Sequence, residues 1–303
     1  MSDLGLVGFL IRWTTLTALL TLVGAVAFRA LVASSTRASL DDEARRDAGR
    51  VAASVGVLAA SILVPIALAK LGLQTAAMRF PDDPWLAVSQ RLVFETDWGK
   101  AWLGQLLTPA LLIAGFVAAR RGARGAWATC GLLVLLLLVA ETLSSHAMAA
   151  RRFERLAVVA DVLHVAGAGT WLGTLGVLLV WLRRRQRIAT PTAPLPLTRM
   201  LAAFSPVALL GAALVVASGV VSAAAHLEHL NQLTGSLYGQ ILIAKVIGVL
   251  VIVLLGWRNW KRLTPTVDRD GPVPMLRSMR YELVATAAVL AITAVLIVMQ
   301  PPG

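Results

Sequence analysis

Long apolar stretches separated by short polar connections run along the whole chain. Each stretch is close to or above the roughly 20 residues that a helix needs to cross a bilayer core about 30 Å thick. The pattern predicts membrane-spanning helices near Leu4 to Ala33, Val51 to Ala77, Trp98 to Ala119, Gly125 to Ser145, Arg155 to Leu182, Met200 to Ala225, Leu237 to Trp257 and Met279 to Met299. We therefore expect an all-α polytopic membrane protein, with a bundle of about eight transmembrane helices formed by residues 1–303 as one domain.

Composition agrees with a membrane protein, because 58% of the residues are hydrophobic and only 15% are charged. The first apolar stretch is too long for a secretory signal peptide and lacks its basic start and cleavage site, so we expect it to remain as a helix. The chain has no glycine-rich loop followed by Lys and Ser or Thr, which argues against an ATP-driven pump. The single Cys130 rules out a metal site built from several thiolates.

Lys and Arg are concentrated in alternate connections. Eighteen lie in the connections around residues 37–50, 120–124, 183–199 and 258–280, and six lie in those around 79–100 and 151–155. Since cytoplasmic loops are enriched in Lys and Arg, both termini should face outward. The net charge of +12 therefore indicates topology and not nucleic-acid binding, and the basic runs are interpreted as cytoplasmic anchors at the lipid headgroups.

All four histidines fall at the predicted outer side: His146, His164, His226 and His229. Histidine is the commonest protein ligand of transition metals, so this placement predicts a metal or haem site that faces outward. Met148 lies close to His146, and imidazole with a thioether would suit Cu(I). His226 and His229 are three residues apart and would share a helical face. Alternatively, Met148 only fills space at the membrane interface, and His226 and His229 are two solvated loop histidines.

The segment from residue 160 to residue 173 carries the strongest polar signal. His164 is expected on the order of 10 to 15 Å inside its helix, with Asp161 one turn above it and Trp171 two turns below. A polar group in hydrocarbon costs several kcal/mol unless it is paired or has a function, so these residues indicate a functional site. The alternative is a His–Asp hydrogen bond that only holds helices together. Gly169 and Gly173 form a GxxxG pair that would admit a neighbouring backbone.

Other charges within the predicted helices need partners. We expect Lys245 to neutralise Glu141 or Asp161, or to line an ion path. Near helix ends, snorkelling should suffice for the side chains of Arg12, Arg29 and Glu282. The longest outer segment, Met78 to Asp97, is expected to form a lid over the outer end of the bundle.

Several motifs between residues 140 and 300 resemble the copper resistance protein D (CopD) family of bacterial inner-membrane proteins. They are LHxxxxxxWLG at residues 163–173, Ala217-Ser218-Gly219, the run from Tyr238 to Lys245, and Leu255-Gly256-Trp257-Arg258-Asn259. The resemblance implies copper uptake across the inner (plasma) membrane, often beside a small periplasmic copper-binding (CopC-like) protein. It places these residues at family-like positions: His146, His164, Trp171, Tyr238 and Lys245.

The leading hypothesis is a copper permease and not an enzyme, with the lipid bilayer as its surroundings and no nucleic-acid partner. The copper ion would be held by His146 and His164 and assisted by Met148, His226 and His229. Asp161 and Lys245 would balance charge. One alternative is a redox protein with haem b held by His146 and His164 as axial ligands on facing helices. Another is a non-catalytic assembly protein in which the histidines are incidental.

Overall fold

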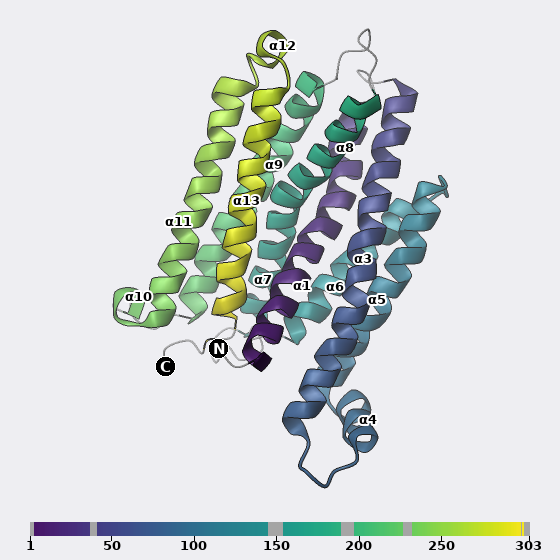
Figure 1. Cartoon of the computed structure of the whole chain (residues 1–303), viewed down its shortest axis with the longest axis vertical. Helices are drawn as coiled ribbons and strands as arrows, with labels where there is room; N and C mark the ends of the chain where they lie inside the picture. Colours follow the sequence, from purple (N-terminus) through teal and green to yellow (C-terminus); the bar gives the residue numbers. More distant parts are fainter. Residues whose placement is uncertain are drawn as a thin grey trace.

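The structure is a computed structural model that describes residues 3–36, 41–144, 154–188, 197–226, 232–297 and 299. These residues form helices and no strands (Figure 1). The elements are α1 (Asp3–Ala27), η1 (Phe28–Val32), α2 (Ala33–Ser35), α3 (Asp42–Met78), α4 (Trp85–Glu95), α5 (Asp97–Arg120), α6 (Ala126–Leu143), α7 (Glu154–Ala168), η3 (Gly169–Gly173), α8 (Thr174–Ile188), α9 (Leu197–His226), α10 (Gln232–Gly235), α11 (Leu237–Arg258), η4 (Asn259–Leu263), α12 (Val267–Asp270) and α13 (Val273–Leu296). The elements η1, η3 and η4 are single π-helical turns.

The expectation of eight membrane spans is confirmed, since the described residues contain eight helices long and apolar enough to cross a bilayer. The helix α3 begins at Asp42, well before the predicted start at Val51, because a capping residue precedes it. The Asp41 carboxylate accepts a hydrogen bond of 2.6 Å from the backbone N–H of Ala44. Such a cap satisfies a backbone donor that the first helical turn leaves unpaired.

The helix α1 lies at the centre of the bundle, where it packs against α3, α6, α8 and α13 (Figure 1). The indole nitrogen of Trp13 donates a 3.0 Å hydrogen bond to the carbonyl of Ala287 in α13. The spans that contain α1 and α7–α8 are the most buried of the eight, whereas α11 is the most exposed. In a membrane, the apolar side chains of α11 therefore face lipid along most of its length.

The contact between α1 and η3 depends on glycines. A Cβ atom added at Gly173 would collide with the backbone of Leu20 and Gly24, and one added at Gly24 would collide with the backbone of Gly173. A Cβ at Gly169 would overlap the side chain of Val23. This confirms that the Gly169–Gly173 pair admits a neighbouring backbone, and the neighbour is α1.

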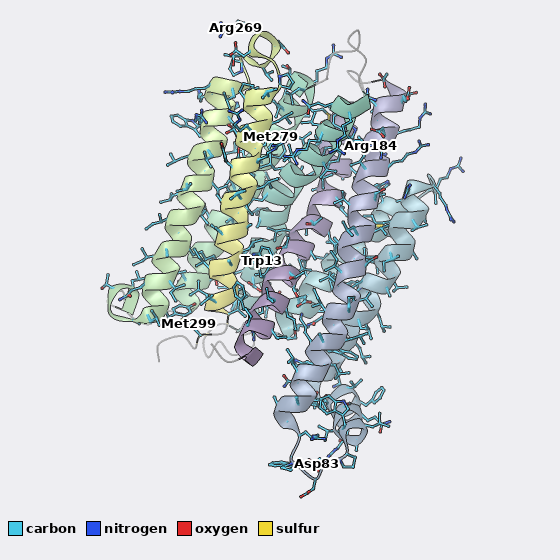
Figure 2. All side chains as sticks on the ribbon, in the orientation of Figure 1. Trp13, Asp83, Arg184, Arg269, Met279 and Met299 are labelled. Atoms are coloured by element: carbon cyan, nitrogen blue, oxygen red, sulfur yellow. The ribbon has the colours of Figure 1, made fainter. Side chains whose placement is uncertain are left out.

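The two ends of the bundle differ in charge (Figure 2). Arg184 in α8 and Arg269 in α12 lie at one end, which we call the basic end, and Asp83 lies at the opposite end. The helices α5 and α8 finish at the basic end, and α3 and α13 begin there (Figure 1). The described part of the chain therefore places the basic connections together, as the charge pattern predicted.

The connection from α3 to α5 contains the short helix α4, which packs against both of them. In Figure 1, α4 lies beside the last turns of α3, next to the start of α5, and away from α7 and α9. The prediction of a lid over the bundle is therefore wrong. This segment extends the α3–α5 pair and does not cover α7, the helix that contains His164.

Candidate functional site

The imidazole of His164 is held between two helices within the membrane-spanning part of the bundle. Its Nδ1 atom lies 3.2 Å from the hydroxyl oxygen of Ser218 in α9. His164 is ten residues into α7, and Ser218 is eight residues before the end of α9, which places both about 12 to 15 Å from the helix ends at 1.5 Å per residue. Close packing of α7 on α9 supports this contact, because a Cβ at Gly167 would collide with Gly211 and Leu214.

The hydroxyl of Ser218 lies within hydrogen-bonding distance of three groups, which are the imidazole of His164 and the backbone carbonyls of Leu214 and Val215 in α9. It donates to the carbonyl of Leu214, one turn earlier in α9, at 2.5 Å. With the hydroxyl proton on this carbonyl, the serine oxygen accepts from the imidazole, and His164 takes the tautomer in which Nδ1 carries the proton. The Nε2 atom then carries a lone pair. Metal-ligating histidines typically have this arrangement, in which the second ring nitrogen donates to a fixed partner.

A carboxylate and an ammonium group accompany His164 in the same region. Asp161 is one turn away on α7 and accepts a 3.2 Å hydrogen bond from the hydroxyl of Thr142 in α6. Lys245 in α11 interacts electrostatically with Asp161 and with His164. We call His164, Ser218, Asp161 and Lys245 the histidine cluster. It contains one acidic and one basic side chain, whose formal charges cancel.

Glu141 has a different partner from the one predicted. Its two carboxylate oxygens lie 2.9 and 2.8 Å from the Nζ atom of Lys70 in α3. Lys70 also donates to the side-chain oxygen of Gln105 in α5 at 3.0 Å, and the Gln105 amide contacts Ser144. The suggestion that Lys245 neutralises Glu141 is therefore wrong, and of the two predicted partners only Asp161 interacts with Lys245.

Sequence reasoning missed Lys70 and Gln105, although Lys70 was detectable as a cation inside a long apolar stretch. Their side chains join α3, α5 and α6 near the end of the bundle opposite the basic end. The side chains of Lys70 and Glu141 are 20% and 17% exposed, so a large part of the pair is removed from solvent. We call these residues, with Ser144, the Lys70–Glu141 network.

Trp171 and Tyr238 each lie seven residues from a member of the histidine cluster, Trp171 after His164 and Tyr238 before Lys245. Trp171 is buried in η3, where its backbone and Cβ lie against Gly211 of α9. Tyr238 is in the first turn of α11, about two turns before Lys245, and is partly buried. Neither side chain offers an imidazole, a thiolate or a thioether, which are the commonest copper ligands, so both fit supporting positions better than ligand positions.

Three predicted metal ligands, His146, Met148 and His229, lie outside the described residues. His226 is the last residue of α9, about two turns beyond Ser218 towards the same end, and its side chain is also outside the described part. Among the described residues, no three side chains of His, Cys, Asp or Glu form a cluster that could hold a metal ion. His164 is thus the predicted ligand that the structure places in a defined environment.

Glu282 in α13 departs from the expected snorkelling. Its side chain is 3% exposed, and its carboxylate accepts a hydrogen bond from the Asn259 amide in η4. Asn259 belongs to the family-like Leu255–Asn259 motif. The prediction was wrong because it treated proximity to a helix end as access to water, whereas the last turn of α11 and η4 covers this carboxylate.

Comparisons with known proteins agree with the motifs described above. Residues 1–153 match the family described as copper resistance protein D-like, N-terminal domain, and residues 198–296 match the family described as copper resistance protein D. The chain is 27% identical over 214 residues to copper transport protein CutJ of Bacillus subtilis (strain 168), an alignment that covers 69% of this chain but 38% of that relative.

No solved structure matches the chain. The matched family descriptions and the name of the relative all refer to copper, and the haem alternative finds no support in them. The first family match alone spans half of the 303 residues. The protein is a multi-pass membrane protein that belongs to the copper resistance protein D family.

Proposed function

We propose that this protein carries copper ions across the bacterial inner membrane into the cell, and that it is a transporter and not an enzyme. The proposal is supported by the copper resistance family, by the name of the copper transport relative, and by the histidine cluster. Copper is the cargo in this proposal, so a weak and transient site serves better than a permanent one.

The observation that carries the proposal is the hydrogen bond between His164 and Ser218. It holds an imidazole inside apolar helices, and in the tautomer with the proton on Nδ1 the Nε2 lone pair is available. A neutral imidazole binds copper in either oxidation state. One fixed imidazole is too few ligands to trap the ion, and the histidines that the sequence places near the predicted outer side would supply others as it enters: His146, His226 and His229.

Lys245 and Asp161 would balance charge while the ion passes. A copper ion near His164 would be repelled by the Lys245 ammonium and attracted by the Asp161 carboxylate. Without copper, the ammonium interacts with that carboxylate. When copper approaches, it would take the place of the ammonium beside Asp161. Lys245 would thus act as a resident counter-charge that the ion must displace.

The driving force for uptake would come from the copper gradient and the membrane potential. Moving one positive charge inward is favoured by about 2.3 kcal/mol per 100 mV of inside-negative potential. A soluble copper-binding protein on the outer side would deliver the ion to the end of the bundle that carries the histidines.

The experiment that tests this proposal uses the full chain reconstituted in liposomes that enclose a copper-sensitive dye. Wild-type protein should give copper entry above that of protein-free liposomes, and entry should increase with an inside-negative potential. His164→Ala should lower the initial rate by on the order of tenfold or more, given the affinity lost when a metal ligand or its partner is removed. Ser205→Ala is the control, because Ser205 also bonds to the carbonyl one turn earlier in α9 but does not contact the histidine. Equal rates for wild type and empty liposomes would contradict the proposal.

A further inference from the structure

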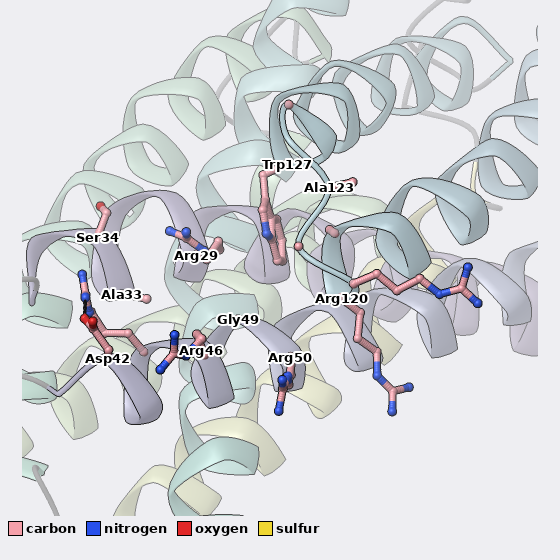
Figure 3. Close-up of a pocket in the computed structure, with 15 residues that line it drawn as sticks. Arg29, Ala33, Ser34, Asp42, Arg46, Gly49, Arg50, Arg120, Ala123 and Trp127 are labelled. Carbon is pink, nitrogen blue, oxygen red and sulfur yellow. Dashed lines mark hydrogen bonds and ion pairs between the residues drawn. The ribbon is translucent and has the colours of Figure 1, made fainter.

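A cavity of about 590 Å³ opens at the basic end of the bundle, away from the histidine cluster (Figure 3). Its walls come from η1 and α2, the first turns of α3, the end of α5 and the start of α6. The volume falls within the range of about 300 to 1,000 Å³ that is usual for small-molecule sites. The described residues that line it include six arginines: Arg29, Arg45, Arg46, Arg50, Arg120 and Arg121.

The arginines of α3 and η1 are arranged around Gly49. Arg46, Gly49 and Arg50 share one face of α3, because they are spaced three and four residues apart. A Cβ atom at Gly49 would lie only 3.6 Å from the Arg29 side chain. The guanidinium of Arg29 is 6.0 Å from the centre of the Trp127 ring (Figure 3). Arg29 therefore lies between the glycine of α3 and the indole of α6.

The cavity lining is strongly positive. Its described residues include one acid, Asp42, which forms an ion pair with Arg45, so that six arginines and one aspartate give a net charge of +5. Asp47, on the same helix, lies 3.5 Å from Arg184 of α8 and does not line the cavity. Like charges so close together repel each other, and an anion among them would remove this repulsion.

Membrane topology alone does not account for this arrangement. The positive-inside bias depends on how many Lys and Arg a connection carries, and it would be met equally by arginines that point separately into solvent. Here arginines from three segments that are distant in the chain line one cavity beside a tryptophan. Basic pockets between membrane helices on the cytoplasmic side are suited to phosphate headgroups, and Trp is common at this depth.

We propose that this cavity binds a phosphate-bearing anion, and that the ligand in the membrane is the headgroup of an anionic phospholipid. Guanidinium groups recognise phosphate oxygens through paired N–H donors. The cavity lies at the ends of membrane-spanning helices, at the start of α3 and between α5 and α6, so a lipid can place its phosphate among the arginines while its chains stay beside the apolar helices. This site is separate from the proposed copper route and does not depend on it.

The test measures lipid binding to the full chain in detergent by native mass spectrometry. The probes are dioleoylphosphatidylglycerol, the zwitterionic dioleoylphosphatidylcholine and inorganic phosphate. Wild type should prefer the anionic lipid by on the order of tenfold, and the double variant Arg46→Gln/Arg50→Gln should lose most of that preference. The matched control is Arg277→Gln/Arg280→Gln, which removes the same charge from exposed positions of α13 at the same end.

The unfolding temperature without lipid shows whether each variant is folded. Loss of preference in the first variant with retention in the control supports a lipid site in the cavity. Binding of inorganic phosphate that competes with the lipid and disappears in the same variant supports the anion site but assigns its ligand to soluble phosphate. Equal binding of both lipids together with no phosphate binding, or equal loss in both variants, overturns the proposal.

Discussion

At the scale of single residues, the histidine cluster shows how polar side chains inside an apolar bundle are satisfied by hydrogen bonds. The Ser218 hydroxyl donates its proton to the carbonyl of Leu214 in α9, and its oxygen can still accept from His164. One small side chain thus positions the imidazole without adding a charge. A ligand positioned in this way does not have to be ordered when the metal arrives, and that ordering would otherwise weaken binding.

Removal of the Ser218 hydroxyl tests this positioning role. In Ser218→Ala the Nδ1 atom loses its acceptor, and the imidazole can rotate or change tautomer. We expect copper affinity, measured by competition with a chelator, to fall by about 10- to 100-fold, as is usual when the partner of a metal-binding histidine is removed. Ser205→Ala should leave the affinity unchanged. Equal affinities for wild type and Ser218→Ala would show that this hydrogen bond does not serve metal binding.

The Lys70–Glu141 network makes a separate prediction about stability. Lys70→Met leaves the Glu141 carboxylate mostly buried without its ammonium, which should lower the free energy of unfolding by on the order of 3 kcal/mol. The double variant Lys70→Met/Glu141→Gln should regain much of this loss, because no uncompensated charge remains. Unfolding in mixed detergent measures both.

The matched control is Lys100→Met, because Lys100 and Asp97 form an exposed ion pair in which the side chains are 72% and 95% accessible. A solvent-exposed pair contributes little, so this variant should unfold like wild type. If Lys70→Met also unfolds like wild type, the buried network is not a stabilising one.

The candidate site could be predicted in part from single residues. His164 and Asp161 stood out because an imidazole and a carboxylate in an apolar stretch need a reason, and both lie in the histidine cluster. The partner of Glu141 could not be assigned in the same way. Lys70 is 71 residues away, and the choice between it and Lys245 depends on which helices are neighbours, which local spacing does not determine.

At the scale of elements, apolar length was enough to predict the eight spans but not their ends or their irregular turns. The segment Gly169–Gly173 forms a π-helical turn, which no hydrophobic pattern indicates, because such turns are rare and short. In contrast, the small residues at Gly169 and Gly173 did predict close helix contact, since the absence of a side chain acts directly on the distance between backbones.

The crossing of α1 and η3 makes a prediction about glycine. Gly173→Ala places a methyl group against the backbone of Leu20 and Gly24, so the helices must separate. We expect the free energy of unfolding to fall by on the order of 2 kcal/mol, as for other overpacked contacts. Gly72→Ala is the control, because a Cβ there meets no atom within 4 Å. It should be neutral or slightly stabilising, because Ala favours the helix more than Gly does, and a similar loss in both variants would contradict the packing explanation.

At the scale of the whole molecule, the bundle separates two kinds of polar chemistry. The histidine cluster and the Lys70–Glu141 network lie towards one end, and the arginine-lined cavity lies at the other. Under the proposed copper uptake, this separation is favourable. Copper would enter where His164 and Asp161 are available, and the strongly positive surface would face the cytoplasm, where it can interact with anionic lipid and does not repel the entering ion.

This arrangement requires one orientation in the membrane, which labelling of introduced cysteines can determine. In a Cys130→Ser background, Asp82→Cys places a thiol beyond α3 at the end opposite the basic end, and Arg269→Cys places one in α12 at the basic end; both positions are exposed. With a membrane-impermeant maleimide, Asp82→Cys should react in intact spheroplasts and Arg269→Cys only after the membrane is permeabilised, because basic connections stay inside. The reverse pattern would place His164 near the cytoplasm, so that copper would meet the arginine-lined end first. That result would contradict uptake through the histidine cluster. It would not contradict binding of copper at the histidine cluster or of an anion in the arginine-lined cavity.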